Sequence, residues 1–336
     1  MRKEAMFWKA SGDKTVYCRL CAHHCKLSRG KFGICGVRKN DDGVLHTYSY
    51  GKMIAANVDP VEKKPFYHFL PGTDAYSIAA AGCNFKCSFC QNWTIARAEV
   101  KRGRFQGESV PPERVVSLAI KNKCRSVSYT YTEPTIFFEY AYDISILAKK
   151  NGLKNSFVTN GFMTCEAIDK IAPYLDAANI DLKFFNDESY RNICNGRLQP
   201  VLESIRRMKD RGIWIEVTTL IIPDKNDSEE ELGRIAGFLS ETGKDIPWHI
   251  SRFHPDYKLR EPPQTPVETL LRAAEIGKKA GLKYVYLGNV SKPGDTVCPA
   301  CGTVLVRRFV RAEFSEDFSE NGKCGFCGIG IEGVWK

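Results

Sequence analysis

Three cysteines, Cys83, Cys87 and Cys90, lie within eight residues of one another in the stretch AAAGCNFKCSFCQNW, directly after an apolar run. Their thiolates can converge on one metal centre from a single loop. A structural zinc ion or an electron-transfer cluster normally takes four protein ligands, whereas three thiolates leave one metal position open for a small molecule. The alternative is an ordinary zinc or cluster site whose fourth ligand, Cys124 or His24, comes from elsewhere.

Composition limits the setting of such a site. The chain has 336 residues, 43% of them hydrophobic, which is enough for one large core with small appendages. The 14 cysteines are grouped rather than scattered, which favours metal sites over disulfides. A reducing cytoplasm is therefore expected, because oxidation damages exposed thiolates. The N-terminal stretch MRKEAMFWKASGDK has no apolar h-region, so no signal peptide is expected. No apolar stretch reaches the roughly 20 residues that a membrane span needs, so no membrane partner is expected.

The net charge of +10 is spread along the chain without a basic run or an RNA-binding motif. We therefore interpret it as a solvated surface and expect no nucleic-acid partner.

Residues 1–72 form a cysteine-rich N-terminal segment, in which CRLCAHHCKLSRGKFGICGVR places four cysteines beside two histidines. So many potential ligands in a short stretch predict a closed metal site, and zinc or an auxiliary iron–sulfur cluster would both fit. The predicted ligands are Cys18, Cys21, Cys25 and Cys35, with His23 and His24 adjacent.

Residues 73–290 alternate between strand-like and helical patterns. Repeated βα units predict parallel strands with helices outside, and right-handed crossovers close them toward a barrel. With about seven strands, the fold class is α/β, a partial TIM-type (βα) barrel. The predicted strands are Tyr76–Ala80, Ser126–Thr130, Ser156–Thr159, Ala177–Leu182, Ile213–Leu220, Trp248–Phe253 and Tyr284–Leu287.

Residues 291–336 contain two Cys-x2-Cys knuckles on either side of the strand-like run Thr303–Val310. This pattern predicts a zinc-ribbon-like segment with a structural zinc ion. The predicted ligands are Cys298, Cys301, Cys324 and Cys327, whereas Cys124, Cys165 and Cys194 stand alone and are interpreted as packing residues.

Polar residues recur where the predicted strands end, which is the edge that carries the active site in βα barrels. Several form pairs two residues apart and so share one strand face. Buried polar pairs are costly unless they bind something, so their placement around the cysteine loop predicts a binding site. These residues are Thr132 and Glu133, Asn160, Asp181 and Lys183, Glu216 and Thr218, and Arg252 and His254.

The Cys-x3-Cys-x2-Cys spacing is the signature of the radical S-adenosylmethionine (SAM) superfamily. The chain resembles the pyruvate formate-lyase activating enzymes of that superfamily and, more closely, the radical SAM member of the three-protein AmmeMemoRadiSam system. The resemblance spans nearly the whole chain. It rests on CAHHCKL, GICGVR, EKKPFYHFLPG, GCNFKCSFCQNW, SYTYTEPTIFFEY, VTNGF, AANIDLKFF, WIEVTTLIIPDKNDS, PWHISRFHP, YVYLGN and the final IEGVW.

The resemblance implies roles for individual residues. Cys83, Cys87 and Cys90 would bind three irons of a 4Fe–4S cluster, whose fourth iron binds SAM. Asp181 and Lys183 are the candidate catalytic residues. Val158 stands where activating enzymes have an aspartate, and valine cannot coordinate a cation beside SAM. The residues implied to contact SAM are Thr132 and Glu133 at its amino group, Asn160, Asp181 and Lys183 around it, and His254 near the ribose.

The function implied is reductive cleavage of SAM to a 5′-deoxyadenosyl radical, which abstracts hydrogen from an unidentified substrate. A low-potential electron donor is the implied partner, together with the AMMECR-like and MEMO-like proteins of the same system. Two alternatives remain: a glycyl-radical enzyme activase, and a non-catalytic iron–sulfur/zinc adaptor that uses its metal sites to bind protein or nucleic acid.

Overall fold

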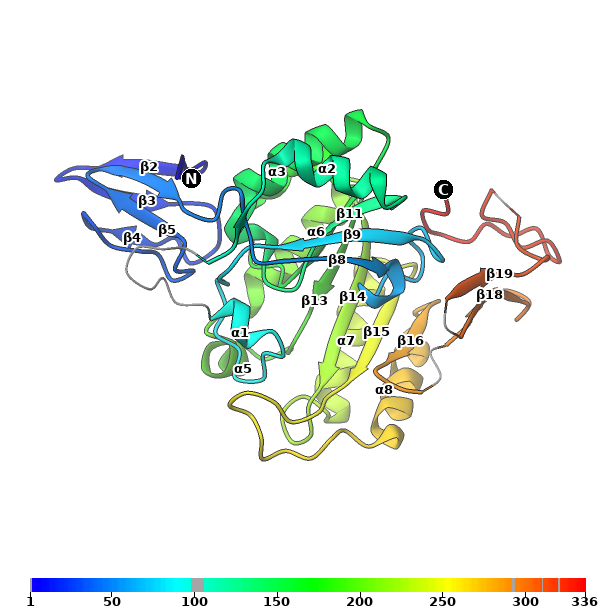
Figure 1. Ribbon diagram of the computed structural model, residues 1–336. Helices are drawn as coiled ribbons and strands as arrows, with labels where there is room; N and C mark the ends of the chain where they lie inside the picture. Colours follow the sequence, from blue (N-terminus) through cyan, green and yellow to red (C-terminus); the bar gives the residue numbers. More distant parts are fainter. Residues whose placement is uncertain (1, 98–105, 292–293, 310, 320) are drawn as a thin grey trace.

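The computed structural model describes residues 2–97, 106–291, 294–309, 311–319 and 321–336. A central sheet with helices lies between an N-terminal group of short strands and a C-terminal three-stranded sheet, at opposite sides of the molecule (Figure 1). Val310, the last residue of a predicted strand-like run, lies outside the described residues.

The central sheet has eight strands in the order β16-β15-β14-β13-β12-β11-β9-β8. Neighbouring strands from β9 to β16 pair in parallel, and β8 pairs antiparallel with β9. Buried apolar and small residues fill the parallel strands, as expected for a sheet that is covered on both faces. The strands are β8 Ala55–Pro60, β9 Asp74–Ala79, β11 Ser126–Tyr129, β12 Lys154–Thr159, β13 Ala177–Asp181, β14 Trp214–Ile221, β15 Trp248–Arg252 and β16 Val285–Gly288.

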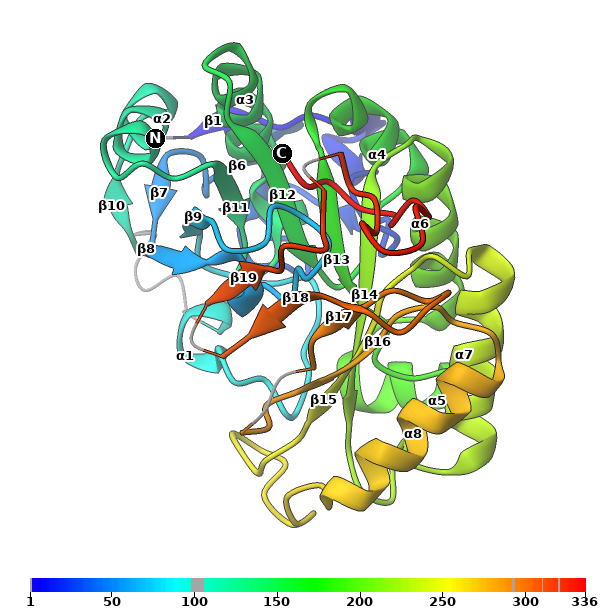
Figure 2. The ribbon, with the colours of Figure 1, turned by 90° about the vertical axis from the view of Figure 1, so that its right-hand side faces the viewer.

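Helices follow the parallel strands, and α6, α7 and α8 lie along one face of the sheet (Figure 2). Local sequence fixes several helix starts: Thr164 and Ser228 accept N-cap hydrogen bonds, and Pro112 occupies a first turn. The α-helices are α1 Trp93–Ala96, α2 Pro112–Lys121, α3 Phe138–Lys150, α4 Cys165–Ile171, α5 Asp187–Ser189, α6 Leu198–Asp210, α7 Glu229–Thr242 and α8 Val267–Lys279. Shorter turns are the 3₁₀ segments η1 Val61–Lys63, η2 Pro134–Phe137 and η3 Ala172–Tyr174, and the π-helical turn η4 Tyr190–Cys194.

The α/β sheet with seven parallel strands confirms the predicted class, but the sheet is open. Its edge strands β8 and β16 do not pair with each other, so the structure does not show a closed barrel. The edge strand β8 overlaps the alternating run Met53–Val58, which predicts a strand of a hairpin-like cover rather than an edge of the central sheet.

The N-terminal segment contributes two small antiparallel sheets, β2-β3-β4 and β1-β6-β5. A further pair joins β7 to β10, far along the chain. The bounds are β1 Lys3–Glu4, β2 Trp8–Ser11, β3 Thr15–Cys18, β4 Lys26–Leu27, β5 Arg38–Asp41, β6 Val44–Thr47, β7 Lys52–Met53 and β10 Glu108–Ser109.

The C-terminal sheet consists of β17 Thr296–Val297, β18 Val304–Arg308 and β19 Ala312–Phe314. It is fastened to the central sheet through the segment at residues 65–71. The buried Arg308 guanidinium donates to the Tyr67 carbonyl at 2.8 Å, and the Leu70 N–H donates to the Val334 carbonyl at 2.6 Å. The C-terminal segment is therefore packed into the molecule rather than attached at its surface.

Beneath this contact, the fully buried carboxylate of Glu216 accepts hydrogen bonds from the backbone N–H groups of Tyr67 and His68 and from the rings of Trp214 and His249. A buried charge is tolerated when donors surround it in this way. Glu216 thus lies inside the sheet and holds the covering segment, although its position in the sequence predicted a place at the active-site edge.

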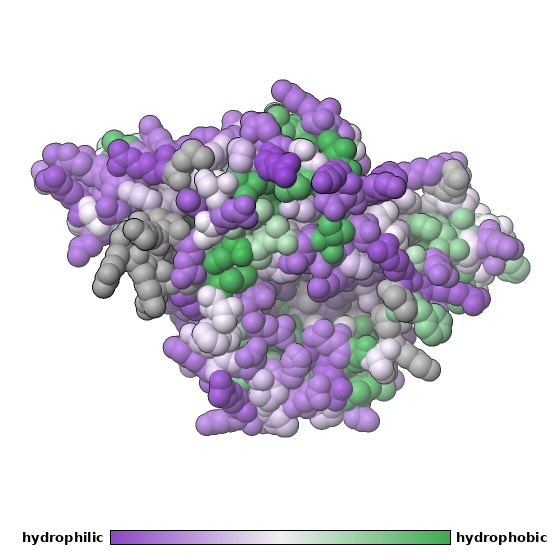
Figure 3. Space-filling view, viewed as in Figure 1, coloured by the Kyte–Doolittle hydropathy of each residue, from purple (hydrophilic) through white to green (hydrophobic). Residues whose placement is uncertain are grey.

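The part of the chain that the structure describes contains no helix long and apolar enough to cross a membrane. The surface seen in Figure 3 is mainly hydrophilic, with small separate hydrophobic patches.

His68 predicts a pH dependence of stability. Its ring donates from Nδ1 to the Glu332 carbonyl and accepts from the Tyr286 hydroxyl at Nε2, each at 2.7 Å. Burial lowers the pKa of His68 to about 4 from its ordinary value of 6.5, although the Glu216 carboxylate opposes this shift. Between these values the unfolded chain binds a proton that the folded chain does not, so stability falls as the pH falls.

We expect His68→Gln to reduce the slope of unfolding free energy against pH by up to about 1.4 kcal/mol per pH unit between pH 6.5 and 4. Unfolding at several pH values measures this slope. The control His254→Gln alters an exposed ring and should retain the wild-type slope. Equal slopes in His68→Gln and the wild type would contradict the assignment.

Candidate functional site

The loop of Cys83, Cys87 and Cys90 begins where β9 ends, at the carboxyl edge of the parallel strands. Gly82 starts it with a φ of +105°, which favours glycine. A Cβ at this position would lie 2.9 Å from the Cys35 carbonyl oxygen, so the N-terminal segment touches the loop directly. The first turn of the loop therefore requires glycine for both conformation and space.

Backbone hydrogen bonds from separate segments hold the loop. The Lys86 and Ser88 N–H groups donate to the carbonyls of Cys194 and Ile193 in η4, at 2.7 and 3.1 Å. On the other side, the Leu259 N–H donates to the Ser88 carbonyl at 3.1 Å. The loop is thus fixed from two strand-end segments at once.

Cys194 lies beside Cys87, and this neighbouring thiol is the main cause of the raised pKa of Cys87. In the sequence Cys194 stands alone, which predicts a packing residue rather than a ligand. Nothing in the sequence pattern connects the two positions, because η4 reaches the loop only through the fold. Of the other single cysteines, Cys124 is buried as predicted, but Cys165 is exposed and does not fill the core.

Asp181 and Lys183 are brought together next to this pair. The Lys183 ammonium lies 2.9 Å from the Asp181 carboxylate at the end of β13. Burial lowers the pKa of Lys183, but Asp181 and the sulfurs of Cys87 and Cys194 outweigh burial and hold the pKa well above its ordinary range. A permanent positive charge therefore faces the cysteine loop.

Asn160 connects β12 to the same loop. Its side-chain N–H₂ donates to Asn84 Oδ1 at 2.8 Å and approaches Cys83 Sγ at 3.9 Å. The Asn84 Nδ2 group is buried and has no partner among the protein atoms that the structure describes. A buried donor without a partner, next to Cys83, fits a site that receives an acceptor from a bound group.

Glu133 is fully buried and engaged by the protein itself. Its carboxylate accepts from the Thr135 N–H and hydroxyl at 3.0 and 2.6 Å, from the Thr159 hydroxyl at 2.7 Å and from the Asn160 N–H at 2.8 Å. Thr132, in contrast, is half-buried and donates to the Ala80 carbonyl at 2.7 Å. The described geometry gives Glu133 a positioning role that orients Asn160.

His254 lies at the rim of the loop, where its Nε2 is 3.3 Å from the side-chain nitrogen of Gln91. Nearby, the rings of Trp93 and Tyr257 stack with centroids 5.2 Å apart. The segment after β15 thus covers one side of the cysteine loop. Arg252, its strand partner in the sequence analysis, instead donates to the Thr265 carbonyl at 2.7 Å.

The N-terminal cysteines Cys18, Cys21, Cys25 and Cys35 line one cavity of about 20 Å³. Burial raises the pKa of Cys21, Cys25 and Cys35. The structure therefore brings the four predicted ligands together, next to the Cys83 loop.

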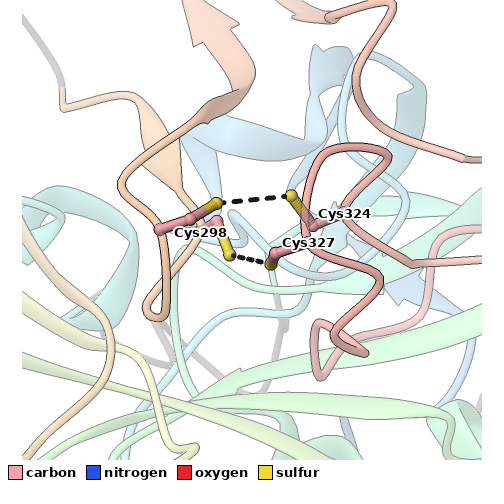
Figure 4. A group of neighbouring side chains, drawn as sticks. Cys298, Cys324 and Cys327 are labelled. Atoms are coloured by element: carbon pink, nitrogen blue, oxygen red, sulfur yellow. Dashed lines mark hydrogen bonds between the residues drawn. The ribbon is translucent and has the colours of Figure 1, made fainter.

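The C-terminal cysteines Cys298, Cys324 and Cys327 point toward one another from two loops (Figure 4), and Cys301 belongs to the same group. Their sulfurs all lie within 4.8 Å of one another, with 3.5 Å between Cys298 and Cys327 and 3.7 Å between Cys301 and Cys324. Sulfurs bound tetrahedrally to one zinc ion at about 2.3 Å stand about 3.8 Å apart. The four thiols therefore fit a single metal ion.

Among the described residues, no other group of three or more potential metal ligands has its ligand atoms within 4.8 Å of one another. The sulfurs of Cys83, Cys87 and Cys90 stand farther apart than the ligands of one ion. This spacing fits thiolates that bind different irons of a cluster. Burial raises the pKa of Cys83 and Cys90, so these ligands need a metal to stay deprotonated.

A family model described as the radical SAM superfamily matches residues 77–239, which include the cysteine loop. This chain is a member of the radical SAM superfamily. It is therefore an enzyme of that superfamily, and membership implies a 4Fe–4S cluster and SAM. The three-cysteine loop, the unpartnered Asn84 donor and the adjacent Lys183 fit those groups.

Among relatives of this radical SAM chain, the uncharacterized protein MJ0808 of Methanocaldococcus jannaschii is 43% identical and covers 98% of this chain and 99% of its own length. The pyruvate formate-lyase-activating enzyme of Clostridium pasteurianum is 22% identical over 54% of this chain and 80% of its own. The crystal structure of Streptococcus suis SuiB covers 63% of this chain and 48% of its own, with 16% identity and a TM-score of 0.49. This last likeness is too weak to carry an argument.

We expect Glu133→Gln to lower the free energy of unfolding by about 2–3 kcal/mol, because an amide would turn its own N–H₂ group toward buried donors. Chemical unfolding measures the loss. Glu166→Gln on the surface of α4 is the control and should change stability by about 0.5 kcal/mol or less. If Glu133→Gln keeps wild-type stability but weakens SAM binding, Glu133 is a SAM ligand rather than a positioning residue.

Proposed function

We propose that this chain cleaves SAM reductively and uses the resulting radical to abstract hydrogen from a substrate. The observation that carries the proposal is the loop of Cys83, Cys87 and Cys90, whose three spaced thiols leave one iron free for SAM. When bound, the cluster and SAM supply the electron transfer and the 5′-deoxyadenosyl radical. The chain itself supplies binding, orientation and exclusion of water.

Individual residues have separate tasks in this proposal. Asn160 positions the loop through Asn84, and Glu133 positions Asn160. The Lys183 ammonium offers a positive charge, and Asp181, about one-third exposed, keeps a carboxylate at the strand edge. An ammonium suits the carboxylate of SAM, and a carboxylate suits its amino group. His254 stands at the exposed rim.

A glycyl-radical enzyme activase is the second candidate. It is supported by the similarity to proteins named pyruvate formate-lyase-activating enzyme and isethionate sulfite-lyase activating enzyme, at 22–24% identity. Against it stands Val158 on β12, an apolar residue packed against Phe66 and its neighbours, where activating enzymes have an aspartate. We therefore favour a different substrate.

The non-catalytic adaptor is a weaker candidate, because a cluster with four protein ligands would serve it equally well. We also propose, from the sequence resemblance, that the chain works with AMMECR-like and MEMO-like proteins and with a low-potential electron donor.

Two cysteine variants test the proposed function. Cys87→Ala should abolish formation of methionine and 5′-deoxyadenosine, because the cluster loses a ligand. Cys194→Ala, at the neighbouring sulfur, should retain it. Mass spectrometry of SAM products under anaerobic reduction measures both.

Electron paramagnetic resonance of the reduced protein supplies the second readout. SAM should change the spectrum of the wild type and of Cys194→Ala. A spectrum that SAM leaves unchanged would contradict the open iron. No SAM cleavage by the wild type, together with iron lost in both variants, would make Cys194 a fourth ligand and favour the adaptor.

We further propose that the C-terminal group holds one structural zinc ion. Hydrogen bonding by Thr303 lowers the pKa of Cys301 to about 6, which favours a thiolate there. Cys301→Ser should remove about one zinc per chain and lower the melting temperature, while the iron content stays unchanged. Elemental analysis measures both metals, with the exposed Cys165→Ser as control. Iron lost in Cys301→Ser, in place of zinc, would overturn the assignment.

A further inference from the structure

The N-terminal cysteine cavity and the radical SAM loop are in direct contact at two points. At the first, the Cys35 carbonyl faces Gly82, the residue before Cys83, at 2.9 Å from the place of a Cβ. At the second, the ring of His23 lies 2.8 Å from the carbonyl oxygen of Asn84, the residue after Cys83. On the first path the contact joins Cys35 itself to the residue before Cys83. On the second path His23 lies two residues from Cys21 and from Cys25, and Asn84 is next to Cys83.

The environment between the two groups couples them further. A carbonyl oxygen can only accept, so the His23 ring donates to Asn84 from Nε2. The Lys86 side chain also lies within electrostatic range of the sulfurs of both Cys83 and Cys35.

The spacing of the sulfurs at the N-terminal cavity differs from that at the C-terminal site. The ligand atoms of Cys18, Cys21, Cys25 and Cys35 do not gather within 4.8 Å, in contrast to the C-terminal cysteines of the same chain. Together with other side chains, among them Leu20 and Ile136, they line a cavity of about 20 Å³, which exceeds the roughly 10–15 Å³ that one water needs. Four thiolates bound directly to one ion leave no such space. The cavity therefore fits a cluster of several atoms better than a zinc ion.

A buried cation completes this cavity. Arg38 is 1% exposed and donates from Nη1 to Cys18 Sγ at 3.3 Å, while Nη2 pairs with the buried Glu139. Its Nε has no partner among the described protein atoms. Hydrogen bonds to ligating sulfurs are a main determinant of the reduction potential of iron–sulfur clusters.

We propose that Cys18, Cys21, Cys25 and Cys35 bind a second iron–sulfur cluster, through which the electron for SAM cleavage enters the protein. The inference rests on the proposed function for the use of that electron. A one-electron carrier protein is oxidised by one electron and reduces the N-terminal cluster. That cluster then returns to its oxidised state as it reduces the site at Cys83, Cys87 and Cys90. Each step transfers one electron only; no proton is transferred and no covalent bond forms or breaks.

The surface beside the cavity suits such a carrier. Phe32 and Ile34 are 38% and 40% exposed there, and Lys26 and Lys31 are exposed in the same segment. An acidic carrier protein with an apolar contact patch would complement these residues. Cys87, by comparison, is buried and offers a carrier no direct approach.

Metal content is the first test. After anaerobic reconstitution, the wild type should bind about eight irons per chain, and Cys21→Ser and Cys87→Ser about four each if both clusters are of the 4Fe type. Cys165→Ser, at an exposed cysteine elsewhere, should keep all of them. Zinc in place of iron at the N-terminal site, lost in Cys21→Ser while the iron stays complete, would overturn the inference.

Electron entry is the second test, and it uses two reductants. Dithionite, a small molecule, should reduce the radical SAM site of Cys21→Ser directly, so SAM cleavage continues. Reduced ferredoxin or flavodoxin should support at least about tenfold slower cleavage in Cys21→Ser than in the wild type. If the carrier protein supports SAM cleavage at equal rates in Cys21→Ser and in the wild type, electrons do not enter through the N-terminal cluster. No cleavage by the wild type with dithionite would instead refute the proposed function, and the iron count would still decide the second cluster.

A variant that keeps all cysteines serves as the control for misfolding. Arg38→Gln combined with Glu139→Gln removes both buried charges together, so neither is left unpaired. It should retain the wild-type iron content and shift the midpoint potential of one cluster only, measured by a redox titration followed by electron paramagnetic resonance. An unchanged potential for both clusters would contradict a cluster against Arg38.

Discussion

The backbone hydrogen bonds that hold the Cys83–Cys90 loop are the interaction on which the rest of the site depends. Three thiols can serve one cluster only if their loop keeps one shape, and a loop without regular structure cannot fix its own shape. Here η4 accepts from Lys86 and Ser88, and Asn160 reaches Asn84 from β12. Each support comes from a different strand end, so the assembled sheet itself determines the spacing of the sulfurs.

A second constraint lies deeper in the sheet. The buried carboxylate of Glu216 is satisfied by the segment at Tyr67 and His68, and this segment in turn receives Arg308 and Val334 from the C-terminal sheet. The C-terminal sheet thereby holds a layer of chain that covers part of the open sheet. An open sheet needs such a cover, because its edge strands do not close on each other.

The three cysteine groups have different geometries, and their chemistry follows from these. The C-terminal sulfurs gather within 4.8 Å and match one ion. The loop sulfurs stand farther apart, and in our proposal they leave a coordination position for SAM. The N-terminal sulfurs enclose a cavity against the loop, where His23 and Gly82 make the contacts. In our proposals, the C-terminal cysteines thus support structure, the loop cysteines support catalysis, and the N-terminal cysteines support electron entry, although the three groups have similar numbers of cysteines.

The sequence by itself determined the elements and the three groups of cysteines. Periodicity located the parallel strands to within two residues, and Cys-x2-Cys spacing marked each cysteine group, because both signals are local. Only the tertiary structure decided which positions meet. Cys194 lies beside Cys87, and Glu216 turned out to be a buried anchor rather than an edge residue. Such contacts join residues over a hundred positions apart. The local sequence around Glu216 and Cys194 therefore contains no pattern that predicts them.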